Sequence, residues 1–112
     1  MTIETNTWDP ISLEELQKLI ISDLPKMSKG QKELWHKISI TPQKWQEDDY
    51  GELGGGFWVV AVLDNQAIWY SDIEDGFNIS SFSIVGKLNE YGAEQDELQW
   101  TMKKLSDYFN KK

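Results

Sequence analysis

Residues 57–70 of the chain read FWVVAVLDNQAIWY, two strongly apolar runs separated by Asp64 and Asn65. Both of these residues tolerate the positive φ that a type I′ turn demands, so the stretch predicts a β-hairpin with a two-residue loop. In such a hairpin Leu63 pairs with Gln66, at the first position after the loop. The hairpin is the strongest signal in the chain, and the rest of the fold is built around it.

Counting back from this loop gives the pairing of the two strands and the face on which each side chain lies. One face carries two cross-strand pairs, Val59 with Tyr70 and Ala61 with Ile68. Trp58 and Trp69 then share the other face. Strands that are apolar on both faces are covered on both, which indicates that the hairpin lies inside a larger sheet.

Two further stretches are candidates for the flanking strands. Phe82, Ile84 and Gly86 alternate with Ser81, Ser83 and Val85, which predicts a strand over 80–88. A second strand is favoured over 34–40, although Ser28 with Gln31 is an alternative signal there, for a helix that begins at Ser28.

Helical patterns lie towards both ends of the chain. Ser12 and Glu15 have the spacing of a capping box, and leucine and isoleucine recur at helical intervals until Pro25, so a helix is expected over 12–24. A second helix is expected over 94–110, with acidic residues in its first turn and lysines near its end. We therefore predict a flexible arm over 1–11, and over 12–112 one α+β domain with a mostly antiparallel sheet of about four strands. Both helices are expected on one face of that sheet, around a core of Leu16, Ile20, Val60, Leu98, Met102 and Leu105.

Charge and composition narrow the classes of function. The chain has 112 residues, with 19 acidic and 11 basic side chains for a net charge of −8, and every basic residue is lysine. Nucleic-acid binding depends on clustered lysine and arginine, so a nucleic-acid partner is not expected. The chain has no cysteine and no apolar run long enough to span a membrane. Its first residues do not form a basic segment followed by an apolar segment, as a signal peptide would. We therefore expect a cytoplasmic protein that does not enter a membrane.

The sequence shows no catalytic constellation. The single histidine, His36, has no nucleophile or orienting carboxylate at a useful spacing, so we expect a structural histidine, no cofactor and no enzymatic activity. The acidic run Asp72, Glu74 and Asp75 leaves one alternative, a small metal-dependent hydrolase, because carboxylate oxygens are ligands for Ca²⁺ and Mg²⁺. Its spacing does not match an EF-hand loop, which favours a solvated acidic turn.

The remaining candidates point to a partner-binding protein. Two acidic segments are expected at one end of the sheet, and their carboxylates are Glu47, Asp48, Asp49 and Glu52, then Asp72, Glu74 and Asp75. Trp58 and Trp69, on their shared face, are either core or a surface for a partner. We predict a protein-interaction module that binds a basic protein partner, as inhibitor and immunity proteins do when an acidic surface imitates nucleic acid. An aromatic-lined protein that binds a small ligand is a further alternative, and the oligomeric state is open.

Overall fold

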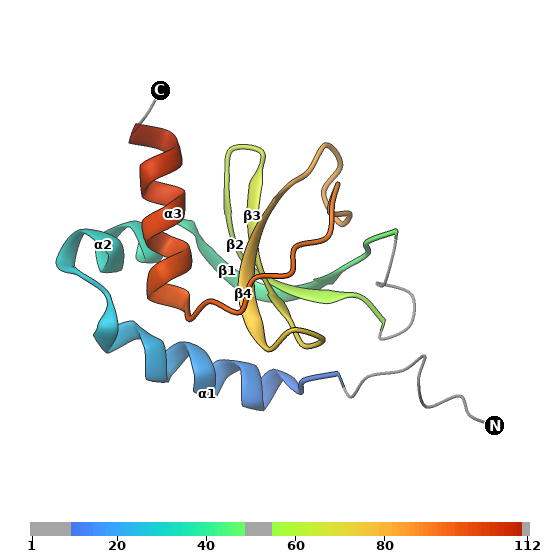
Figure 1. The fold of residues 1–112 in the computed structure, drawn as a ribbon, viewed down its shortest axis with the longest axis horizontal. Helices are drawn as coiled ribbons and strands as arrows, with labels where there is room; N and C mark the ends of the chain where they lie inside the picture. Colours follow the sequence, from blue (N-terminus) through green and yellow to red (C-terminus); the bar gives the residue numbers. More distant parts are fainter. Residues whose placement is uncertain (1–9, 49–54, 111–112) are drawn as a thin grey trace.

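The computed structural model of the chain describes residues 10–48 and 55–110 and forms an α+β domain (Figure 1). Its elements, in chain order, are α1 (Leu13–Asp23), a 3₁₀ turn (Leu24–Lys26), α2 (Lys29–Ile38), β1 (Ser39–Trp45), β2 (Phe57–Leu63), β3 (Gln66–Ser71), β4 (Gly76–Ser81) and α3 (Leu98–Asn110). The four strands form one antiparallel sheet in the order β1-β2-β3-β4. The predicted fold class is confirmed.

The hairpin that the sequence predicted is β2 and β3. Leu63 pairs with Gln66 and Ala61 with Ile68, as expected, and Asp64 adopts a φ of 53° in the loop. Of the two loop residues only Asp64 has a positive φ, so the loop lacks the second positive φ of the type I′ turn that the sequence predicted. A second tight turn connects β3 to β4, and Asp75 lies in it with a φ of 60°.

The predicted register fails beyond Ala61. An irregularity between Val59 and Ala61 shifts the pairing by one residue, so that Val59 pairs with Trp69 instead of Tyr70, and Trp58 pairs with Tyr70. An extra residue in one strand of an antiparallel pair produces such a β-bulge. Every side chain of β2 before the bulge therefore lies on the face opposite to the predicted one.

Three helices cover one face of the sheet. Their apolar side chains pack on Val60, Ala61, Ile68 and Phe77 in a single core that contains residues of α1, α2 and α3. Five of the six predicted core residues are buried in it, and the sixth, Ile20, is partly buried and packs against it; the five are Leu16, Val60, Leu98, Met102 and Leu105. The expected two-layer arrangement of helices on a sheet is confirmed, with α2 as an additional member.

The other face of the sheet is covered by the segment that follows β4, drawn in orange in Figure 1. Leu88, Phe82 and Tyr91 of this segment pack on a second core that includes Phe57 and Trp69. The predicted strand over 80–88 is wrong, because β4 ends at Ser81 and the chain then folds over the sheet. Backbone hydrogen bonds from Gln46 N to Gly86 O and from Leu88 N to Gln46 O, both 2.9 Å, hold it there.

The strand favoured over 34–40 is also wrong, since residues 29–38 form α2. Both halves of a capping box are present, because the Ser28 side chain accepts from Gln31 N and the Gln31 side chain accepts from Ser28 N. Trp35 and Ile38 are buried while His36 is exposed. A period of 3.6 residues therefore describes this stretch better than the alternation that suggested a strand.

The C-terminal helix begins later than the predicted residue 94. It starts at Leu98, and residues 94–97 instead connect it to the edge of the sheet, where Phe77 N donates to Asp96 O at 2.8 Å. The acidic residues expected in its first turn precede it. The N-terminal helix follows the prediction, with Ser12 and Glu15 forming the capping box.

Candidate functional site

The sheet topology brings the two predicted acidic segments to the same end of the sheet. Residues 46–48 follow β1, and residues 72–75 connect β3 to β4, both at the end opposite to the Asp64 turn. Asp49 and Glu52 lie outside the described residues. Asp48 is exposed and forms an ion pair with Lys87 at 3.1 Å, while Glu47 is buried.

The three carboxylates of the acidic turn have different surroundings. Asp72 Oδ2 accepts a hydrogen bond from Ile11 N at 2.8 Å, and Glu74 Oε2 accepts one from the Tyr91 hydroxyl at 3.2 Å. Asp75 is exposed. Within the described parts of the chain, no three His, Asp or Glu side chains are grouped in a way that would hold a metal ion.

Ile11 is held from two sides in front of this turn. Besides the hydrogen bond from its N–H to Asp72, its carbonyl accepts one from Trp58 Nε1 at 3.0 Å. Two side chains of the sheet and its turn thus hold both backbone polar groups of one residue, as a neighbouring strand would. This contact fixes the entry into α1 beside the acidic turn.

A small cavity of about 260 Å³ lies between the start of α1 and the acidic turn. We call it the acidic pocket and define it by the residues that line it: Pro10, Ile11, Glu15, Tyr70, Asp72 and Asp75. Three carboxylates and one phenol surround it, and no lysine is among these residues. Asp72 Oδ1 is buried here without a hydrogen-bond partner.

Burial and nearby carboxylates both affect the ionisation of Tyr70 in this pocket. The pKa of its phenol is raised to about 12, first by burial and then by four nearby carboxylates, those of Asp75, Asp72, Asp23 and Glu15. Burial and negative charge both disfavour a phenolate, so the two effects act in the same direction. The pocket is therefore a region of negative potential around an aromatic ring.

The sequence identified Asp72 and Asp75 but missed Glu15 and Tyr70. Glu15 was recognised only as a capping residue, and it does accept from Ser12 N at 3.2 Å. Its position beside the turn follows from the packing of α1 on the sheet and has no local signal. Tyr70 was assigned to a strand face without a function.

The predicted tryptophan patch does not exist as a surface. Trp58 and Trp69 lie on opposite faces because of the bulge in β2, with Trp58 against the helical core and Trp69 in the second core. Trp69 is fully buried, and its Nε1 donates to Ser80 Oγ at 2.9 Å. Trp58 is half-buried, with the Lys44 ammonium 5.0 Å from its ring centroid.

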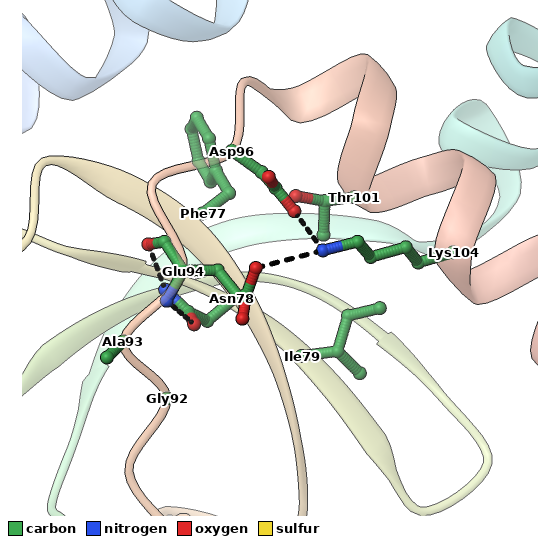
Figure 2. A pocket seen from close by; sticks show the side chains of 9 residues that line it. All are labelled: Phe77, Asn78, Ile79, Gly92, Ala93, Glu94, Asp96, Thr101 and Lys104. Atoms are coloured by element: carbon green, nitrogen blue, oxygen red, sulfur yellow. Dashed lines mark hydrogen bonds and ion pairs between the residues drawn. The ribbon is translucent and has the colours of Figure 1, made fainter.

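A second cavity, of about 330 Å³, lies at the outer edge of β4 (Figure 2). The Asn78 side chain binds the backbone of Glu94 twice, accepting from its N–H at 2.8 Å and donating to its carbonyl at 3.1 Å. On the other side of the cavity, the Lys104 ammonium of α3 lies between the carboxylates of Glu94 and Asp96. These two carboxylates raise the pKa of Lys104.

Comparison of the chain with protein-family models, curated proteins and solved structures gives no significant match. Across residues 10–48 and 55–110, no helix combines the length and the apolar character needed to cross a bilayer.

Proposed function

We propose that the protein is a non-enzymatic interaction module of the cytoplasm that binds a basic protein partner through its acidic pocket. The observation that carries the proposal is the lining of the pocket, where carboxylates from α1 and from the β3–β4 turn surround the aromatic ring of Tyr70. The raised pKa of Tyr70, caused by burial and then by these carboxylates, agrees with this arrangement. A nucleic-acid partner is not proposed, since its phosphates would meet this negative potential.

A lysine or arginine side chain of the partner fits the chemistry of the pocket. Its cationic head would lie among the carboxylates of Glu15, Asp72 and Asp75, and its aliphatic stem would contact Ile11 and the ring of Tyr70. The buried and unpartnered Asp72 Oδ1 would be near a hydrogen-bond donor. Negative potential around the pocket would also accelerate the encounter with a basic partner.

Tetralysine peptide is a suitable probe of the proposal. Binding is measured by calorimetry and by the backbone amide shifts of residues 70–76, at low salt and at physiological salt. The test variant combines Glu15→Gln with Asp75→Asn, because Gln preserves the capping box and Asp75 is exposed. We expect an affinity about two- to fivefold lower at low salt, as for exposed ion pairs, and a smaller difference at high salt.

The matched control combines Asp64→Asn with Asp107→Asn. It also removes two negative charges, but from exposed positions away from the acidic pocket. Asp64 lies in the turn at the opposite end of the sheet, and Asp107 lies on α3. The control is expected to bind tetralysine as the wild type does. Equal losses in the two double variants would show that only net charge attracts the peptide, and the proposal would then be abandoned.

A further inference from the structure

The outer edge of β4 is paired at both ends but open in its middle. At one end Phe77 N donates to Asp96 O at 2.8 Å. At the other end, Ser81 O accepts from Asn89 N at 2.9 Å and Ser81 N donates to a carboxylate oxygen of Glu90 at 2.6 Å. Residues 77 and 81 therefore point their backbone polar groups away from β3.

Ile79 lies midway between these two residues and has the same orientation. Backbone groups alternate in direction along a strand, so its N–H and C=O also point outward from the sheet. Among the described residues, no hydrogen-bond partner binds either group. Ile79 lines the cavity at this edge (Figure 2), so the open position faces a space that a ligand can enter.

The gap arises because the chain leaves the edge of β4 between residues 90 and 96. Over this interval it is tied to β4 by side chains instead of by backbone pairing, through Asn78 to Glu94 and through Ser80 Oγ to Glu90 O at 2.9 Å. Gly92 lies so close to Asn78 that a Cβ there would be 3.0 Å from its Cγ. The detour is thus fixed by specific contacts, and the open position at Ile79 is a built feature.

The charges beside the gap favour a basic occupant. Glu94 and Asp96 contribute two carboxylates and Lys104 one ammonium, which leaves one negative charge. Ile79 packs towards the helical core, and residues directly opposite each other in adjacent strands point their side chains to the same face. A residue paired with Ile79 would therefore extend its side chain towards α3, where these carboxylates lie.

We propose that an extended basic peptide segment of a partner protein adds to the edge of β4, with one lysine or arginine residue paired with Ile79. Its N–H and C=O exchange two hydrogen bonds with Ile79, and its side chain binds Glu94 and Asp96 beside Lys104. This inference deepens the proposed function and shares its partner class, but it rests on a different surface.

Three capped tripeptides test this pairing by NMR titration of the full chain. They are acetyl-Thr-Lys-Thr-amide, the same peptide with a methyl group on the backbone amide nitrogen of the lysine, and acetyl-Thr-Glu-Thr-amide. The lysine peptide is expected to shift the amide signal of Ile79 and slow its hydrogen exchange. Methylation removes one hydrogen bond, and glutamate reverses the charge, so each change is expected to weaken binding about tenfold.

Protein variants separate the backbone contact from the charge contact. Glu94→Gln with Asp96→Asn is expected to reduce the preference for lysine over glutamate, whereas the Asp64→Asn and Asp107→Asn control retains it. Ile79→Pro removes the outward N–H, which an edge strand tolerates. In this variant the response is read at the neighbouring amides of Asn78 and Ser80, and the shifts that the lysine peptide causes there are expected to disappear.

Two outcomes would overturn the inference. One is the absence of any shift at Ile79 with the lysine peptide at millimolar concentration. The other is equal binding of the methylated and unmethylated lysine peptides. This comparison uses the wild-type protein alone, so it does not depend on whether a variant folds. Either result leaves the acidic pocket untouched, because tetralysine binding there is read at residues 70–76 and is changed by Glu15→Gln with Asp75→Asn.

Discussion

The carboxylate of Asp23, the last residue of α1, accepts a hydrogen bond at 2.9 Å from the backbone N–H of Leu98, the first residue of α3. The two residues are 75 positions apart, and both are buried. The first N–H groups of a helix lack partners within the helix, so a carboxylate near them stabilises the helix start. One helix thus caps another and fixes where α3 begins.

Replacing Asp23 by Ala is expected to lower the free energy of unfolding by about 1–3 kcal/mol, because it leaves a buried N–H without an acceptor. Asp23→Asn keeps a side-chain oxygen and is expected to cost less. Urea unfolding followed by circular dichroism measures both, with Ser22→Ala, at an exposed position of the same helix, as the control. Equal stability of the Ala variant and the wild type would contradict a capping role.

Gly76, at the start of β4, lies against the chain that returns to the edge of the sheet. A Cβ at this position would overlap the backbone of Gln95 and be 2.7 Å from Asp96 N. Neither contact is the end of a flexible side chain, so we expect Gly76→Ala to cost about 2–4 kcal/mol in unfolding free energy.

The matched substitution is Gly30→Ala in α2, where nothing lies within 4 Å of the added Cβ. Alanine is the better helix former, so this variant is expected to gain about 0.5–1 kcal/mol. Thermal and urea unfolding should therefore give changes in unfolding free energy of opposite sign for the two variants, a loss for Gly76→Ala and a gain for Gly30→Ala. A neutral Gly76→Ala would show that the return segment can move away from β4.

Local signals in the sequence predicted the elements whose boundaries depend on local chemistry. The turn at Asp64, the capping box of α1 and the two apolar runs of the hairpin all follow from neighbouring residues. The bulge near Val60 has no such signal, because residues 59–62 are all apolar and suit either face of a sheet covered on both sides. That one insertion is enough to separate Trp58 from Trp69.

The prediction of a strand over 34–40 was wrong for a different reason. Leu34, Ile38 and Ile40 fit an alternating pattern, while Leu34, Trp35 and Ile38 fit a helical one, so the two periods overlap in a short window. The capping box at Ser28 favours the helix. The acidic pocket could be predicted only in part, because the approach of Glu15 to Asp75 depends on how α1 packs on the sheet.

The metal-dependent alternative has a direct test in the acidic turn. Asp72 binds Ile11 and Glu74 binds Tyr91, so these carboxylates are directed to different protein groups. Millimolar Ca²⁺, Mg²⁺ or Mn²⁺ is therefore expected to leave the melting temperature unchanged. A bound ion at 100 times its dissociation constant would add about 2.7 kcal/mol of stability. A clear rise that Asp75→Asn removes would restore the metal site as a candidate.

The raised pKa of the Tyr70 phenol in the acidic pocket predicts how the stability of the protein changes at alkaline pH. Its pKa is about 12 in the folded protein against an ordinary value of 10.0, so the folded state holds this proton more tightly than the unfolded state. The resulting stabilisation is fully present below pH 10 and is lost as the pH rises through about 12. Subtracting the ultraviolet titration of Tyr70→Phe from that of the wild type isolates this phenol, and its midpoint is expected near 12.

Asp75→Asn should move that midpoint towards 10.0, because it removes the carboxylate that contributes most after burial. The Asp64→Asn substitution, at the other end of the sheet, should leave the midpoint unchanged. Stability curves between pH 9 and 12 should show a smaller alkaline loss for Tyr70→Phe than for the wild type. A midpoint near 10.0 in the wild type would mean that neither burial nor the carboxylates act on this ring. An unchanged midpoint in Asp75→Asn would contradict the action of its carboxylate on Tyr70, and the electrostatic argument for the acidic pocket would fail.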